Sequence, residues 1–286
     1  MQPGGGPLAP AKVCLATLTD APFRSRSFMA RTPREARREA PPEPRRRRPP
    51  GALGAHFGGR IDPFTSAVLV FPLFLTYQLG ILGRGGSGQN GVDFITRALI
   101  ELCERDLGNY LGVLGSGLLA YAALLVILRQ YGRFNPRVFL PMLAESAFYA
   151  MTMGTLILFA IHRFLEVIPS LAVASAIPVA DIVVISAGAG LHEEFIFRVI
   201  GMGGLGFLLA GITGPRRAWV FALVLSSLVF SLAHHIGPAG EAFTFAAFVY
   251  RTLAGVFFAL VYQLRGFAVA AWTHALYDVY VLSLHG

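Results

Sequence analysis

Three ionisable residues stand close together in a strongly apolar stretch of the chain. The stretch AGAGLHEEFIFRVI, from Ala187 to Ile200, holds Glu193, Glu194 and Arg198 within six residues. A charged side chain at the centre of a bilayer costs a few kcal/mol, so such residues usually pair with one another or face a polar cavity. The group is therefore either a structural ion network or part of a reactive site.

The spacing of these residues separates their roles. Glu194 and Arg198 are four positions apart, which places them on one face of a helix where they can form an ion pair. Consecutive residues of an α-helix are rotated by about 100°, so Glu193 points away from that pair. We predict that Arg198 neutralises Glu194, while the carboxylate of Glu193 is available for chemistry.

Two further polar groups follow on later apolar segments. Phe230 and His234 lie in SSLVFSLAHH, and His274 and Asp278 lie four positions apart in WTHALYD. Hydrolysis of an amide needs a base that takes a proton from water and a partner that holds the water or protonates the leaving nitrogen. Further donors must face the developing oxyanion. We predict that Glu193 and the two histidines line one polar cavity, with Phe230 packed over it to exclude bulk water.

The same region contains the ligand types that zinc prefers. However, the zincin pattern H-E-x-x-H is absent, because the residue four positions after His192 is Ile196. No G-x-S-x-G nucleophile elbow occurs either. We therefore predict a site without a cofactor and keep zinc as the alternative. The candidate ligands for zinc are His192, Glu193, Glu194, His234, His235 and His274.

The composition indicates that most of the chain lies in a membrane. Of the 286 residues, 55% are hydrophobic and only 14% are charged, whereas a soluble domain carries about 25% charged residues. Apolar runs approach the ~20 residues that a helix needs to cross the hydrocarbon core. We predict an all-α polytopic transmembrane bundle of about seven spans, with a range of six to eight. The runs cover residues 64–83, 109–128, 138–161, 179–212, 218–236, 243–262 and 267–284.

The first 60 residues have a different composition. They hold 12 of the 24 Lys and Arg residues but only 4 of the 16 Asp and Glu residues, so they carry the whole excess charge of +8. They are rich in Pro, Gly and Arg and lack apolar periodicity, which predicts disorder. We expect this tail to remain cytoplasmic and to touch anionic lipid rather than nucleic acid. The lipid-binding residues would be Arg45, Arg46, Arg47 and Arg48.

The remaining chain divides into two predicted parts. Residues 61–180 would form N-terminal transmembrane helices with an interfacial amphipathic helix over residues 92–110, and residues 181–286 would form the catalytic core. With the tail inside, seven spans place the basic loops at 129–137, 216–217 and 265 on the cytoplasmic side. The run 179–212 would reach ~50 Å as one straight helix, so we expect the glycines of residues 201–206 to kink or break it.

The three polar groups resemble the motifs of a known family. HEEFIFR, FSLAH and HALYD are similar to the series E-E-x-x-x-R, F-x-x-x-H and H-x-x-x-(N/D) of the CPBP family. These intramembrane proteases include the CAAX-prenyl endopeptidases and the bacteriocin-processing or Abi proteins. Any one motif is weak, but three in this order are specific. The resemblance covers roughly residues 180–282, and we expect substrate choice to depend on residues 1–180.

The resemblance implies a role for each glutamate. Glu193 would be the general base on water with His234 as its partner, and Glu194 with Arg198 would be structural. It also implies a glutamate-type mechanism in which no metal is obligatory.

The resemblance places His274 and Asp278 on the oxyanion side of the site. Many members of the family have Asn where this chain has Asp278. An ionised Asp cannot donate a hydrogen bond to an oxyanion. Asp278 is therefore either protonated or orients His274.

These observations together predict an intramembrane endopeptidase that cuts a membrane-associated protein or peptide in a leader or C-terminal sorting segment. The protein would be integral to the inner membrane of a bacterium. One alternative is a metal-dependent protease that uses the same residues. Another is a non-catalytic immunity or binding protein on the same fold, which would need a broken motif. A transporter with a proton relay should show an inverted repeat, and we find none.

Overall fold

The computed structural model describes residues 59–84, 92–165, 177–237 and 240–285. Every regular element in these ranges is a helix, which confirms the predicted all-α class. Seven segments there are long and apolar enough to cross a membrane, so the chain is an integral membrane protein, as predicted. They are Pro63–Gly83, Leu107–Leu128, Pro136–Arg163, Val179–Thr213, Pro215–Ala233, Phe245–Arg265 and Phe267–Leu284.

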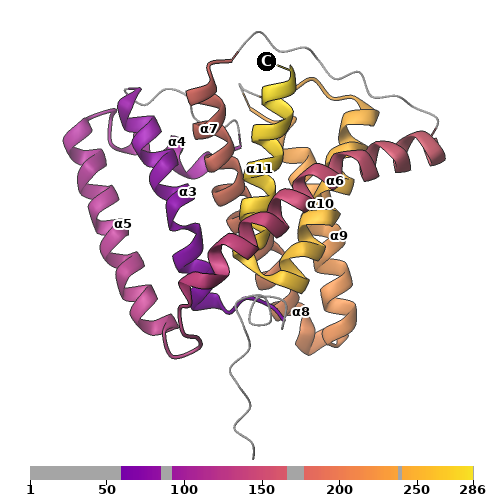
Figure 1. Cartoon of the computed structure of the whole chain (residues 1–286), viewed down its shortest axis with the longest axis horizontal. Coiled ribbons are helices and arrows are strands. Elements are labelled where there is room, and N and C mark those ends of the chain that lie inside the picture. The colour runs from indigo at the N-terminus through magenta and orange to yellow at the C-terminus, as the bar shows by residue number, and fades with distance from the viewer. Residues whose placement is uncertain (1–58, 85–91, 166–176, 238–239, 286) are drawn as a thin grey trace, which may run out of the picture. The chain divides into compact units, whose positions relative to one another are not determined.

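The helices that make up these segments are labelled in Figure 1. The first three spans are α3 (Pro63–Gly83), α5 (Leu107–Leu128) and α6 (Phe139–Leu165), with a 3₁₀ turn, η1 (Pro136–Val138), before α6. The fourth span contains α7 (Val179–Gly188) and α8 (Leu205–Thr213). The last three are α9 (Pro215–Ala233), α10 (Phe245–Arg265) and α11 (Phe267–His285). Of the predicted tail, residues 1–60, only the last two positions lie within the described residues.

Short polar residues and glycines set the ends of these helices. Asp62 caps α3 by accepting a hydrogen bond from the Thr65 N–H at 2.9 Å, as expected for an N-cap residue. Gly214 (φ 82°) and Gly266 (φ 99°) make the tight turns before α9 and α11, because a residue without a Cβ adopts positive φ at little cost. Across these two turns α8 packs against α9, and α10 packs against α11.

The predicted amphipathic helix over residues 92–110 is shorter than expected. It is α4 (Phe94–Leu102), and α5 already begins at Leu107. Glu104 (φ 53°) and Arg105 (φ 60°) adopt left-handed conformations, which cannot continue a right-handed helix. They therefore separate α4 from α5. Its place at the membrane interface stays a prediction.

The helix α11 lies at the centre of the bundle. It packs against α3, α6, α7 and α10, and its residues Ala268 to Ala271 are completely buried. In contrast, α5 packs only against α3 and α4 among the strongly contacting elements, and its apolar side chains are largely exposed. Figure 1 shows α5 at the edge of the bundle beside α3. The polar motif on α11 is thus carried by the best packed helix.

The long run of residues 179–212 forms a single span. Of the predicted kink or break at the glycines of residues 201–206, the break is wrong, because the helix continues from Val179 to Thr213, and the kink stays a prediction. Its middle is wider than an α-helix: η2 (Ala189–Glu193) and η3 (Phe195–Gly204) are π-helical. π-Helical turns are rare and frequently mark functional sites. Both acidic residues of the first motif lie in or directly beside these turns.

Two glycines allow the π-helical segment to approach its neighbours closely. A Cβ on Gly188 would collide with the ring of Tyr77 on α3. A Cβ on Gly190 would collide with the Ala271 carbonyl oxygen and would lie 2.7 Å from the Ala275 Cβ on α11. The segment is therefore held between α3 and α11, and this contact fixes the position of the residues that follow.

Gly190→Ala should destabilise the protein because its new methyl group would meet the backbone of α11. We expect the free energy of unfolding to fall by about 1–3 kcal/mol, as for an overpacked core. Denaturant or thermal unfolding of the purified protein in detergent measures this change. The control is Gly211→Ala in α8, where a Cβ meets nothing within 4 Å. Equal stability of the two variants would contradict the close packing at Gly190.

Candidate active site

A buried carboxylate connects two of the three motifs. Glu194 is completely buried, and its Oε2 lies 3.0 Å from Nε of Arg198, as the i, i+4 spacing predicts. Its other oxygen, Oε1, accepts a hydrogen bond from Nδ1 of His274 at 2.9 Å. Glu194 therefore holds a cation on its own helix and an imidazole on α11. The second contact was not predicted, because the partners are 80 positions apart.

Aromatic rings complete the surroundings of Arg198. Its Cζ lies 4.7 Å from the centre of the Phe230 ring and 5.8 Å from that of Phe258. A guanidinium over a ring face is stabilised by the negative face of the π-system, and more strongly when water is excluded. Arg198 is completely buried, and the ion pair and the rings offset part of its lost hydration.

The second carboxylate faces the second motif. Glu193 is 2% exposed, and its Oε2 lies 3.4 Å from Nε2 of His234. Nδ1 of the same imidazole lies 2.8 Å from the Phe230 carbonyl oxygen. Because a carbonyl can only accept, Nδ1 carries a proton, and the neutral ring presents an unprotonated Nε2 to Glu193. The two glutamates thus have separate partners, as predicted.

Phe230 brings the two imidazoles together. Its ring centre lies 4.8 Å from that of His234 and 5.9 Å from that of His274. Phe258 stacks on the other side of His274 with ring centres 4.4 Å apart. The three motifs therefore meet in one place, although the water-filled cavity that we expect between them stays a prediction.

Asp278 lies at the more exposed edge of this group. Its Oδ2 is 3.7 Å from Nε2 of His274, which is beyond a direct hydrogen bond. The closest polar partner of His274 is therefore Glu194 rather than Asp278. The side chain of Asp278 is 24% exposed to solvent, whereas that of His274 is 5% exposed.

A further polar cluster adjoins the site from outside the three motifs. The hydroxyl of Tyr77 donates to Oδ2 of Asp93 at 2.6 Å, and both residues are completely buried. The same carboxylate oxygen lies 3.7 Å from Nδ1 of His192, the residue before Glu193. Asp93 also caps α4 by accepting a hydrogen bond from the Thr96 N–H. The pattern D-x-x-T before an apolar run predicts that cap, but nothing in the sequence predicts its contact with His192.

The residues considered for zinc do not form a coordination site. Among the residues that the structure describes, no group of three or more His, Cys, Asp or Glu side chains is arranged to hold a metal ion. His192 faces the Gly188 carbonyl and His235 faces the Glu241 carbonyl, each at 3.2 Å. A site without a cofactor stays a prediction, with zinc as the alternative.

The comparison with known families agrees with the three motifs. The family model of the type II CAAX prenyl endopeptidase Rce1-like proteins matches residues 174–280. No curated protein and no solved structure matches the chain. The matched residues include all three motifs and the π-helical segment, but not Tyr77 or Asp93. The resemblance to the CAAX-protease family is thereby confirmed over residues 174–280, which carry the pattern of a membrane-embedded protease.

Proposed function

We propose that this chain is an intramembrane endopeptidase in which Glu193 is the general base on water. The observation that carries the proposal is the contact between the Glu193 carboxylate and Nε2 of His234, at 3.4 Å in a nearly dry setting. A carboxylate and an imidazole so placed can both hydrogen-bond one water molecule beside them and share its proton. The family match supports the reaction class.

The proposed steps follow from the hydrogen-bonding state of His234. Its Nδ1 proton is directed to the Phe230 carbonyl, so Nε2 is free to exchange a proton with Glu193 or with water. Glu193 takes a proton from water as the oxygen attacks the scissile carbonyl carbon. The proton then passes to the leaving nitrogen, directly or through Nε2 of His234, and the peptide bond breaks.

His274 is proposed to stabilise the oxyanion. Glu194 fixes its Nδ1, and the stack on Phe258 fixes the plane of its ring. Because Nδ1 already donates to Glu194, Nε2 can donate only when His274 is an imidazolium, and its N–H then points toward the side where Asp278 lies. A donor that is oriented before the reaction stabilises developing charge without reorganisation. In this arrangement Asp278 orients His274 or donates a hydrogen bond in its protonated form.

Glu194 and Arg198 are proposed to act as a structural brace. Their ion pair is completely buried, and the removal of one partner of a buried pair costs about 3–5 kcal/mol because a charge is left uncompensated. The brace also holds His274, so its loss should affect both the fold and the reaction.

The substrate is proposed to be a membrane-associated protein or peptide that is cut in a leader or C-terminal sorting segment. A site buried among apolar helices admits a chain that is itself close to the membrane. The basic residues Arg45 to Arg48 are proposed to hold the N-terminal tail on anionic lipid at the cytoplasmic surface. A substrate-trapping pulldown with Glu193→Ala would recover the peptides that bind.

We also infer that Asp93 is a positioning residue. It touches neither the proposed water nor the scissile bond, but it faces His192 in the turn that presents Glu193. Tyr77 supports it from α3, and the same ring packs against Gly188 at the end of α7. The helices outside the family match therefore hold the π-helical turn in place.

Glu193→Gln and Glu194→Gln should have different effects. Glu193→Gln keeps the shape but removes the base, so cleavage of a trapped peptide should fall by orders of magnitude while thermal stability stays near that of the wild type. Glu194→Gln leaves Arg198 without its counter-charge and should lose stability by about 3–5 kcal/mol as well as activity. Cleavage assays and unfolding curves of the two purified variants separate base from brace.

Two controls sharpen this comparison. Adding Arg198→Met to Glu194→Gln removes the uncompensated charge and should restore part of the lost stability. The metal-dependent alternative expects a chelator to abolish activity and added zinc to restore it, and the non-catalytic alternative expects no cleavage by the wild type. A fully active Glu193→Gln, or one that is less stable than Glu194→Gln, would show that the assignment is wrong.

Asp93→Asn should impair catalysis without unfolding the protein. Asn caps a helix about as well as Asp and can still accept from Tyr77, so only the charge beside His192 is lost. We expect kcat to fall at least about tenfold, with KM and thermal stability little changed, because misplacement of a catalytic group by ~1 Å costs about a hundredfold. Asp93→Glu should not restore kcat, since a longer side chain moves the carboxylate. Wild-type kcat in Asp93→Asn would exclude a positioning role.

A further inference from the structure

The three connections that carry residues 129–137, 216–217 and 265 lie at one end of the bundle. The backbone N–H of Ile61, just before α3, donates to the Arg265 carbonyl at the end of α10. Gly132, in the connection between α5 and α6, lies against Asp62. Arg216 and Arg217 lie in the first turn of α9, and Figure 1 shows the turn between α8 and α9 at the lower end of the bundle, where α3 begins. The loops that the sequence analysis assigns to the cytoplasm are therefore on a common side.

The candidate active site lies near the opposite end. His234 follows Arg216 by 18 positions along and just beyond α9, a distance of about 27 Å at 1.5 Å per residue. This is close to the ~30 Å of a bilayer's hydrocarbon core. On α11, Asp278 lies 12 positions beyond Gly266, or about 18 Å. Figure 1 shows the end of α11 at the top of the bundle, away from the α8–α9 turn.

Polar residues mark the surface above the site. Glu241, which is exposed, forms an ion pair with Arg251 on α10. The backbone N–H of Glu241 also donates to the His234 carbonyl at 2.9 Å. Exposed charged residues so close to His234 indicate that this edge of the site meets water rather than lipid.

We infer that the site opens at the surface opposite the basic loops, which the positive-inside rule makes the non-cytoplasmic surface. This inference rests on the proposed function. It narrows the substrate class to exported polypeptides whose scissile bond emerges at the outer edge of a membrane segment. A protein that is anchored by a short C-terminal span with its main domain outside meets this requirement.

Labelling in intact cells tests the orientation without any cleavage. In a background with Cys14→Ser and Cys103→Ala, single substitutions Ala242→Cys and Arg133→Cys are exposed to a membrane-impermeant maleimide. Ala242 and Arg133 are both exposed in the structure. We expect Ala242→Cys to react in intact cells and Arg133→Cys to react only after the membrane is permeabilised.

The outcomes separate this inference from the proposed function. The reverse pattern, or equal labelling of the two positions, overturns the inference whether or not the protein is a protease. Outside labelling of Ala242→Cys supports the orientation even if Glu193→Gln proves fully active. A peptide trapped by Glu193→Ala that carries no exported region would also overturn the substrate class.

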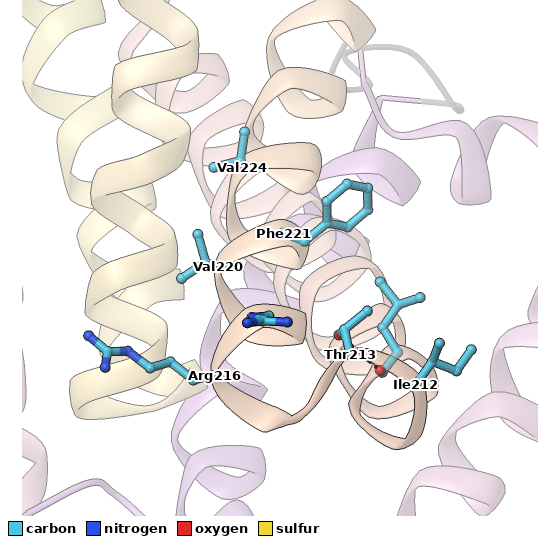
Figure 2. Close-up of a pocket in the computed structure, with 8 residues that line it drawn as sticks. Ile212, Thr213, Arg216, Val220, Phe221 and Val224 are labelled. Atoms are coloured by element: carbon cyan, nitrogen blue, oxygen red, sulfur yellow. Dashed lines mark hydrogen bonds between the residues drawn. The ribbon is translucent and has the colours of Figure 1, made fainter.

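A second inference concerns an apolar groove at the basic end. Figure 2 shows this groove, of about 910 Å³, along α8 and α9. Ile212, Val220, Phe221 and Val224 expose between 47% and 82% of their surface there. Arg216 and Arg217 stand at its end, both exposed, and neither forms an ion pair within the described chain. No acidic residue lines the groove.

We propose that this groove binds one anionic phospholipid. Arg216, Val220 and Val224 are spaced four positions apart, so they form one row along α9. A phosphate would bind the two guanidinium groups, and an acyl chain would lie along the row toward the membrane interior. Arginines directly beside a span on the cytoplasmic side are suited to the anionic lipids of that leaflet.

Native mass spectrometry of the delipidated protein titrated with phosphatidylglycerol or phosphatidylcholine tests this site. Loss of both arginines in Arg216→Gln/Arg217→Gln should weaken phosphatidylglycerol binding by about 25-fold, since each basic side chain contributes roughly a factor of five. Val220→Trp, which fills the groove but keeps the charges, should also weaken binding. The matched control is Arg129→Gln/Arg133→Gln, which removes two exposed arginines from another basic loop.

We expect Arg216→Gln/Arg217→Gln and Val220→Trp to bind phosphatidylglycerol more weakly than the wild type, and the control to bind it as strongly as the wild type. Equal loss in the control would mean that net charge attracts the lipid and would overturn the site. Unchanged binding in Val220→Trp, or full displacement of the lipid by inorganic phosphate, would also overturn the proposed lipid site. Either result would mean that the two arginines bind the phosphate group and that the apolar groove contributes nothing.

Discussion

The rest of the site depends on the two contacts that the buried carboxylate of Glu194 makes, with Arg198 and with His274. Its two oxygens hold Arg198 at 3.0 Å and His274 at 2.9 Å, so it joins the fourth span to α11. Burial strengthens each contact, because attraction between charges is larger in a low dielectric. Loss of either partner would also lower the stability strongly, because a desolvated charge would be left without compensation. The position of His274 relative to Glu193 is therefore set by one residue that need not react.

The π-helical segment explains how two adjacent glutamates serve different partners. A wider turn changes the direction of side chains relative to an α-helix, so Glu193 reaches His234, just beyond the end of α9, while Glu194 reaches His274 on α11. Such turns are rare because they are less favourable than α-helical ones. The segment is kept in this form by close packing, in which Gly188 and Gly190 lie directly against α3 and α11.

The sequence predicts the spans and local pairs much better than the contacts between helices. The seven apolar runs correspond to the seven spans within a few residues, because bilayer thickness fixes their length. The pair Glu194–Arg198 follows from helical spacing alone. The contact of Glu194 with His274 joins positions 80 apart, and that of Asp93 with His192 joins separate helices. Both depend on how the helices pack, which no periodicity encodes, and the continuous span through the Gly201–Gly206 region likewise depends on its neighbours.

The proposed reaction would depend on helices that lie outside the family match. The matched residues 174–280 supply every group with a proposed chemical role, whereas α3 and α4 supply Tyr77 and Asp93. These helices lie outside the match, yet they contact the turn that carries Glu193. The turn that carries Glu193 is therefore supported by buried contacts with α3 and α4. Asp93 is the central residue of this support, because it is fully buried. A carboxylate away from water is stable only where it keeps its hydrogen-bond partners, which here are Tyr77 and the Thr96 N–H.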